Sequence, residues 1–126
     1  MTRIIVRKDC GNSPKNNLIL QFTIAIAKQD TNFIVDRSTD TVQWSFVGGL
    51  SIEGKENLVE FLERENKDEI AALTIRHVLS HGKAGAVDGT QKYKNGGTAA
   101  FCNVYEFGNT KGTLISGIAT YLIEAK

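Results

Sequence analysis

The sequence of 126 residues predicts a single α+β domain, in which three helices pack on a mixed but mostly antiparallel sheet. Helical spacing of apolar residues occurs only in the first half of the chain. The second half instead contains strand-like segments that are separated by turn sequences. A chain of this length buries roughly two thirds of its unfolded surface, so it can form a core without disulfides or metals. We expect one domain over 1–126, with 1–13 as a peripheral N-terminal segment.

The first helix is predicted over 14–29. Leu18 and Phe22 begin an apolar stripe with helical spacing, and Ser13 followed by Pro14 is a favoured helix start. The serine caps the helix and the proline fits its first turn.

Two shorter helices should follow. The segment 30–38 opens with capping residues and carries Phe33 for docking onto the rest of the domain. The segment 55–66 places Leu58 and Phe61 on one stripe.

Five strands complete the predicted fold. A strand alternates apolar and polar residues around Trp44, which indicates one buried and one wet side. The four later segments form a meander, because short glycine-containing turns at 82–83, 95–96 and 108–112 separate them. The predicted strands are 39–47, 70–81, 84–93, 98–107 and 113–123.

The composition excludes several kinds of partner. The chain has 15 Lys and Arg against 14 Asp and Glu, so it lacks the basic excess typical of nucleic-acid binding. It contains no run of roughly 20 apolar residues and no signal-peptide pattern at its start. Cys10 and Cys102 lack a CxxC spacing, which favours reduced thiols. We therefore expect a cytoplasmic protein that binds neither nucleic acid nor a membrane.

Three segments carry a resemblance to a known family. They are 38–44 (Ser-Thr-Asp-Thr-Val-Gln-Trp), 54–62 (Gly-Lys-Glu-Asn-Leu-Val-Glu-Phe-Leu) and 103–107 (Asn-Val-Tyr-Glu-Phe). With this order of elements, the chain resembles the NTF2-like superfamily over about 14–124. Within that superfamily it is similar to the SnoaL-like polyketide cyclase and ketosteroid isomerase group. A shared fold of this kind predicts architecture, whereas activity depends on the site.

The resemblance implies a strongly curved sheet that wraps around the helices as a cone with a deep apolar pocket. It also implies a homodimer formed through the sheet. In members that catalyse isomerisation, a basic carboxylate, a phenol and a second acid occupy positions that correspond here to Trp44, Phe22 and Asn103. These three side chains cannot perform the same proton transfers. We therefore expect the pocket to remain without the steroid isomerase mechanism.

Turn lengths predict how polar residues align across the strands. A two-residue turn at 82–83 pairs His77 with Asp88 and Ile75 with Thr90. A two-residue turn at 95–96 places Asp88 opposite Asn103, whereas a turn one residue later places it opposite Tyr105. Under the first alternative, His77, Asp88 and Asn103 form one polar row.

The polar row is predicted to face the pocket. His77 shares the parity of apolar Leu73 and Ile75, and the family resemblance also places Asn103 inward. A carboxylate beside an imidazole is typical of a general base, although such a pair also occurs as a purely structural contact. Asp88 would orient His77, and Asn103 would donate to a carbonyl.

Other residues complete the predicted site. Cys102 has the opposite parity from Asn103 and should lie on the outer face as a small apolar residue. On a strand, His77 and His81 would lie about 13 Å apart, so we expect no shared metal, and no nucleotide or flavin motif indicates a cofactor. Aromatic residues of this kind serve either as packing or as a pocket wall. The predicted wall comprises Phe22, Phe33, Trp44, Phe61, Ile75, Thr90, Phe101 and Tyr105.

Three functions remain open at this point. The first is cofactor-free acid-base chemistry of the isomerase, dehydratase or cyclase type on a small apolar molecule, with His77 as base. The second is a pocket that binds such a molecule without chemistry. The third is an interaction module that acts mainly by dimerising through its sheet.

Overall fold

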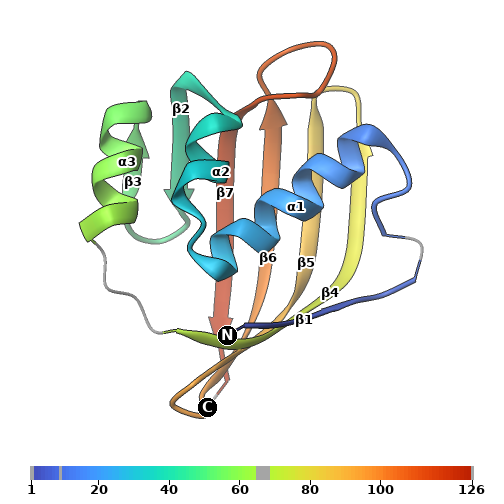
Figure 1. Cartoon of the computed structure of the whole chain (residues 1–126), viewed down its shortest axis with the longest axis vertical. Helices are drawn as coiled ribbons and strands as arrows, with labels where there is room; N and C mark the ends of the chain where they lie inside the picture. Colours follow the sequence, from blue (N-terminus) through green and yellow to red (C-terminus); the bar gives the residue numbers. More distant parts are fainter. Residues whose placement is uncertain (1, 9, 65–68, 126) are drawn as a thin grey trace.

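The computed structural model describes residues 2–8, 10–64 and 69–125, and it confirms the predicted α+β class (Figure 1). Every predicted helix and strand is present, and two short strands are added near 3–6 and 51–53. The elements in chain order are β1 (Arg3–Val6), α1 (Pro14–Lys28), α2 (Thr31–Asp36), β2 (Ser38–Phe46), β3 (Ser51–Glu53), α3 (Lys55–Arg64), β4 (Ile70–His81), β5 (Ala84–Tyr93), β6 (Thr98–Phe107) and β7 (Ile115–Glu124).

The strands form one sheet of seven strands in the order β1-β4-β5-β6-β7-β2-β3. Pairing is antiparallel except at β1–β4 and β2–β7, where the strands are parallel. Helix α1 lies across one face, which we call the inner face, and the opposite one is the outer face (Figure 1). No helix in the described ranges is both long and apolar enough to cross a membrane.

The helix ends follow the sequence signals closely. The Ser13 hydroxyl accepts the backbone N–H of Asn16 at 3.1 Å, and Pro14 occupies the first turn. Helix α1 ends at Gln29, whose left-handed backbone (φ 59°) lets its N–H reach the last carbonyls of the helix. This tight ending turns the chain directly into α2.

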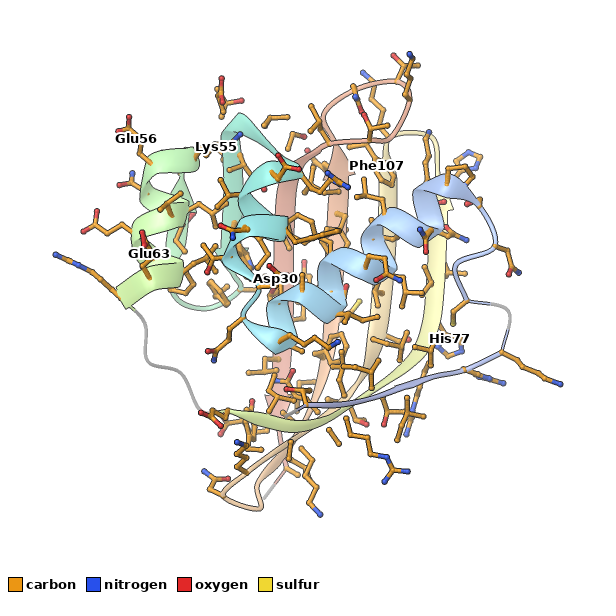
Figure 2. The ribbon with its side chains drawn as sticks, viewed as in Figure 1. Asp30, Lys55, Glu56, Glu63, His77 and Phe107 are labelled. Atoms are coloured by element: carbon orange, nitrogen blue, oxygen red, sulfur yellow. The ribbon has the colours of Figure 1, made fainter. Side chains whose placement is uncertain are left out.

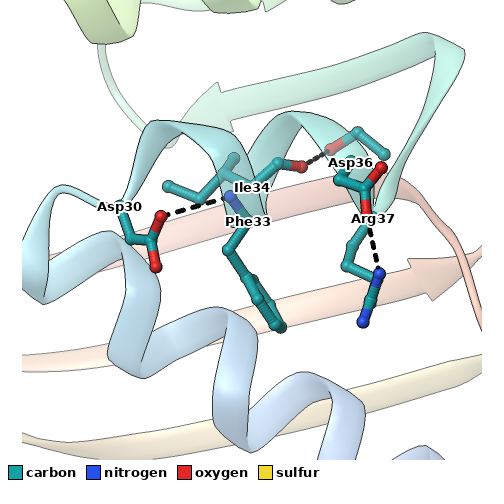
Figure 3. A network of polar contacts seen from close by, with 6 residues as sticks. Asp30, Phe33, Ile34, Asp36 and Arg37 are labelled. Atoms are coloured by element: carbon teal, nitrogen blue, oxygen red, sulfur yellow. Dashed lines mark hydrogen bonds and ion pairs between the residues drawn. The ribbon is translucent and has the colours of Figure 1, made fainter.

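Helix α2 has only six residues and is held by contacts at both of its ends (Figure 3). The Asp30 carboxylate accepts the backbone N–H of Phe33 at 3.2 Å. The buried Ser38 hydroxyl donates to the Ile34 carbonyl at 2.6 Å. These bonds compensate for a length at which an isolated helix would not be stable.

The core lies between α1 and the inner face, where side chains fill the space between ribbon layers (Figure 2). Phe22 of α1 is fully buried and meets the Tyr105 ring edge to face, with centroids 5.7 Å apart. Trp44 on β2 stacks on Phe46 at 4.9 Å. This aromatic packing joins the helical layer to the middle of the sheet.

A β-bulge in β4 changes which of its side chains face inward. Ile75 pairs with Gly89, but His77 pairs with Asp88, so Arg76 is an extra residue in β4. A Cβ atom on Gly89 would lie 1.9 Å from the Thr74 carbonyl oxygen, so the strand opposite the bulge requires glycine. The predicted pairing of Ile75 with Thr90 is therefore wrong, because the alternation does not continue through the bulge.

The turn between β5 and β6 also differs from the prediction. Tyr93 pairs with Gly97 through a 2.8 Å backbone bond, which leaves a loop of three residues, 94–96. Gly96 has the positive φ (97°) that the last position of such a loop requires. Asp88 therefore lies opposite Cys102, and neither Asn103 nor Tyr105 is its partner.

Candidate ligand-binding cavity

A cavity of about 430 Å³ opens between the helices and the inner face of the sheet. Its volume is within the range of sites for small organic ligands. Apolar side chains from α1, β2, α3, β4 and β6 form most of its surface: Ile26, Trp44, Phe46, Leu62, Leu73 and Phe101. The cavity therefore suits a molecule with a largely apolar body.

A chain of hydrogen bonds forms the buried polar part of the cavity region. The Trp44 indole N–H donates to the Thr120 hydroxyl at 2.9 Å, and that hydroxyl donates to the Asn103 Oδ1 at 2.8 Å. The Asn103 amide then donates to the Tyr105 hydroxyl at 3.3 Å. Tyr105 lies 2.7 Å from the Thr23 hydroxyl, which completes a network from β2 to α1.

The environment of Tyr105 keeps its phenol neutral. The residue is fully buried, and this burial raises the pKa of its hydroxyl well above the usual range. Hydrogen bonds from Thr23 and Asn103 partly oppose that shift in the pKa. The phenol is therefore neutral at physiological pH and serves as a hydrogen-bonding group.

Charged side chains are absent from the lining that the described residues provide. These residues contribute threonine, glutamine and asparagine as polar groups, and Tyr93 as the one titratable side chain. Gln91 donates to the Tyr93 hydroxyl at 2.8 Å near the polar side of the cavity. No Asp, Glu, His, Lys, Arg or Cys occurs among these lining residues, so the visible wall is electrically neutral.

The predicted His77–Asp88 contact exists but lies on the outer face. His77 Nδ1 is 2.8 Å from Asp88 Oδ1, which confirms the pairing from the 82–83 turn. The two side chains are 56% and 42% exposed, and neither lines the cavity. Arg7 Nη1 approaches His77 Nε2 at 3.4 Å, and Figure 2 labels His77 on β4. The prediction that His77 and Asp88 face the pocket was wrong, because the bulge at Arg76 reverses the alternation.

Asn103 is separated from this pair by the sheet. Its amide is buried on the inner face, while its neighbour Cys102 lies opposite Asp88, as the predicted outer position of Cys102 required. Burial and then the Asp88 charge raise the pKa of the Cys102 thiol, which favours the unreactive protonated form. The predicted row of three polar residues therefore does not form: Asn103 belongs to the cavity and His77–Asp88 to the outer surface.

The predicted pocket wall is correct in part. Trp44 and Phe101 line the cavity, whereas Phe22, Ile75 and Tyr105 are fully buried core residues behind it. The remaining three predicted residues do not line the cavity. Phe61 packs on Trp44, Phe33 packs on Phe22 beneath Arg37, and Thr90 pairs with Thr74 and Ala100 on the outer face.

Several lining residues were not predicted, notably Thr23, Gln91, Tyr93 and Thr120. Thr120 pairs with Asn103 across β6 and β7, so a correct register there would have found it. No group of three His, Cys, Asp or Glu side chains in the described ranges is placed to hold a metal.

Comparison with known proteins identifies the class of fold. An α+β domain in which one sheet packs on helices around a cavity is typical of the NTF2-like fold. Solved structures with that fold are similar to this chain in backbone structure. An NTF2-like protein of unknown function from Burkholderia xenovorans has a TM-score of 0.74 at 18% identity, covering 89% of this chain and 84% of its own.

Two further structures carry the names of enzymes. A candidate ketosteroid isomerase from Kribbella flavida matches with a TM-score of 0.74 and 14% identity, over 89% of this chain and 79% of its own. A candidate SnoaL-like polyketide cyclase from Shewanella denitrificans matches with a TM-score of 0.73 and 12% identity, over 87% and 91%. No protein-family model and no curated protein matches the sequence. The chain therefore has the NTF2-like fold, and these identities carry no conclusion about its activity.

Proposed function

We propose that the cavity binds a small, uncharged and mainly apolar molecule without acid-base chemistry. The observation that carries this proposal is the neutral lining, in which the described residues supply no carboxylate, imidazole or amine. Acid-base catalysis needs a titratable group within hydrogen-bonding reach of the substrate. Tyr93 is the one titratable side chain in that lining, and its hydroxyl accepts a hydrogen bond from Gln91 at 2.8 Å.

The alternative of an isomerase, dehydratase or cyclase with His77 as base loses its geometric support. His77 and Asp88 are solvent-exposed on the outer face, so a molecule in the cavity does not contact them. The enzyme names of two structural neighbours belong to those proteins. The family resemblance implies that Phe22 and Trp44 correspond to the phenol and the base of the isomerase group, and their replacement supports the binding function.

The binding proposal can be tested by nuclear magnetic resonance with tetralin, an uncharged bicyclic hydrocarbon. The sequence contains one tryptophan, Trp44, and it lines the cavity, so the single indole N–H resonance reports on occupancy. We expect this resonance to shift saturably with tetralin. Absence of any shift up to the solubility limit, with the protein folded, would contradict the proposal for ligands of this size and class.

A matched pair of alanine substitutions locates the binding. Ala27 is buried and lines the cavity, so Ala27→Phe should fill it and abolish the tetralin response. Ala86 lies on the outer face between Leu79 and Val104, so Ala86→Phe should leave the response unchanged. Equal loss in both variants would show that binding does not take place in the cavity.

We also propose that the outer face forms a homodimer with a second copy. Large apolar side chains are exposed on this face, with Leu79 at 64% and Ile123 at 73%, and Val104 lies between their strands. Large apolar side chains exposed on one sheet face support its use as an interface. Sedimentation of the wild-type protein should show a dimer, and Val104→Glu should shift it toward monomer. A wild-type monomer at all concentrations would overturn this proposal.

A further inference from the structure

We propose that the free edge of β1 binds an extended acidic segment of another protein, which adds to the sheet as a further strand. Two features of β1 support this role: its position at the end of the sheet and the charge of its side chains. The proposed surface lies apart from the cavity and does not depend on what the cavity binds.

Strand β1 forms an open edge of the sheet. It stands at the end of the strand order, and β4 is its one neighbour among the strands of the described residues (Figure 1). The opposite edge differs, because β3 has only three residues and α3 packs against it. An open edge presents unpaired backbone groups to which another chain can hydrogen-bond. The sheet is therefore open to strand addition at β1.

The backbone groups available at this edge belong to Ile4 and Val6. The Arg7 N–H donates to the Ile75 carbonyl at 3.1 Å, so Arg7 turns its backbone groups toward β4. The direction of these groups alternates along a strand, so Ile5 also faces β4, whereas Ile4 and Val6 face away from it. An added antiparallel strand would bond to the N–H and C=O groups of both residues.

The charge along the same edge is positive. The sequence of 3–8 is Arg-Ile-Ile-Val-Arg-Lys, and the first carboxylate of the chain is Asp9. Arg76, the extra residue of the β4 bulge, is exposed next to the end of β1. Within the described ranges no carboxylate forms an ion pair with Arg3, Lys8 or Arg76. These cations are complementary to carboxylates supplied by a partner.

The same charge disfavours a second copy of the chain as the occupant. In an antiparallel pair centred on Ile5, Arg3 of one copy would lie opposite Arg7 of the other. Like charges that lie directly opposite each other destabilise a strand pair. A strand with carboxylates at those two positions would instead form an ion pair at each end. The occupant is therefore a different, acidic chain.

The side chains also define the pattern of the acidic segment. Arg3, Ile5 and Arg7 occupy alternate positions, so they share one face of the sheet. This is the outer face, where Arg7 approaches His77. Ile5 is 41% exposed between the two arginines, so the complementary pattern is acidic, apolar, acidic at every second residue. A nucleic acid would match the cations but would not pair with the strand backbone.

The test uses the peptide Ac-Glu-Thr-Val-Thr-Glu-NH₂, followed through the backbone amide resonances of the protein in about 20 mM salt. Its carboxylates can lie opposite Arg3 and Arg7 while its valine lies opposite Ile5. We expect saturable downfield shifts and slower solvent exchange for the Ile4 and Val6 amides, because new hydrogen bonds form there. The Ile5 amide already faces β4 and should change little.

Two control peptides separate charge from backbone pairing. Ac-Lys-Thr-Val-Thr-Lys-NH₂ keeps the strand pattern with the opposite charge. Ac-Glu-Pro-Val-Pro-Glu-NH₂ keeps the charge but lacks the N–H groups that would bond to the Ile4 and Val6 carbonyls. Each control should bind about tenfold more weakly than the acidic peptide, because it loses one of the two contributions.

A matched pair of charge reversals locates the site on the protein. Arg3→Glu should weaken binding of the acidic peptide about tenfold and allow the lysine peptide to bind. Lys111→Glu makes the same change of charge at an exposed residue of the loop between β6 and β7, at the opposite end of the molecule from β1 (Figure 1). This control should leave the affinity within about twofold of wild type.

Three results would overturn the inference. The first is equal binding of the three peptides, or no shift of the Ile4 and Val6 amides up to about 20 mM acidic peptide. The second is tighter binding of a short oligothymidylate, which would identify nucleic acid as the occupant. The third is movement of these two resonances with protein concentration alone, which would identify a second copy. The Trp44 indole resonance reports on the cavity separately, so none of these results affects the proposed binding function.

Discussion

Two polar rows cross the same sheet one residue apart, and they differ in nearly every physical respect. The inner row joins Asn103 to Thr120, and its asparagine is 4% exposed. The outer row joins His77, Asp88 and Cys102, and its hydrogen-bonded His77–Asp88 pair is about half exposed. The inner row has neutral groups in a directed chain, and the outer row has titratable groups in contact with water.

The difference shows that burial, more than residue type, decides what a polar contact contributes. A neutral bond in the buried row cannot be replaced by water, so losing one partner leaves the other unsatisfied. An exposed ion pair is screened and exchanges readily with solvent, so it contributes about 0–1 kcal/mol. His77 and Asp88 are residue types that often act in acid-base catalysis, but Asn103 and Thr120 are the residues that line the cavity.

The largest effect should follow from disturbing the bulge that separates the two rows. Gly89→Ala places a Cβ against the Thr74 carbonyl oxygen, so the backbone must shift. We expect a loss of about 3 kcal/mol or more in the free energy of unfolding, measured by urea denaturation. Gly117→Ala is the control, because its Cβ would meet Glu106 at an ordinary 3.4 Å. Similar losses in both variants would contradict the role of the bulge.

The contributions of the two rows to stability can be compared by one substitution to leucine in each row. Asn103→Leu removes the partner of both Thr120 and Tyr105 and should cost about 3 kcal/mol in unfolding free energy. Asp88→Leu removes an exposed contact and should cost less than about 1 kcal/mol. Urea denaturation of both variants measures this contrast, and a larger loss for Asp88→Leu would reverse our ranking of the rows.

A smaller effect should appear at alkaline pH. Burial raises the pKa of Tyr105, so the folded protein retains the phenolic proton above the pH at which the unfolded chain releases it. The stabilisation from the neutral phenol is thus fully present below about pH 10 and declines as the pH rises further. Tyr105→Phe should cost about 1 kcal/mol at pH 8 and should lose part of the alkaline decline. Denaturation series from pH 8 to 11 in both proteins would show parallel curves if Tyr105 made no such contribution.

The smallest effect concerns the exposed contact between His77 and Asp88. A double-mutant cycle with His77→Ala and Asp88→Ala should give a coupling of about 0.5 kcal/mol or less. In 1 M salt the coupling should fall further, because the Debye length shortens to about 3 Å. A coupling above about 2 kcal/mol at low salt would mean that this pair contributes as much to the free energy of unfolding as the buried row.

The sequence was sufficient for the fold because its signals were local. The Ser13-Pro14 start and the Asp30 cap both lie within one helical turn of what they stabilise. The two-residue turn at 82–83 likewise fixed the nearby pairing of His77 with Asp88. Such features depend on neighbours in sequence, which a single chain displays directly.

The site was less predictable because it depends on register far from the turns. Asn-Gly at 95–96 fits loops of two or three residues, and the single-residue difference moved Asp88 from Asn103 to Cys102. No residue within β4 signals the bulge at Arg76 in the sequence. Its one sequence signal is Gly89 on the neighbouring strand, whose importance appears only when the pairing is known.

The bulge also has a consequence for changes in chain length. Because Arg76 is the extra residue, a chain that lacked it would keep Ile75 opposite Gly89 and His77 opposite Asp88, with each side chain on its present face. A second register shift in β4 lies between Ile70 and Ala72, but loss of a regularly paired residue such as Val78 would exchange the two faces for the rest of the strand. A deletion at Arg76 therefore preserves the alternation that forms the cavity wall, whereas a deletion at a regularly paired position does not.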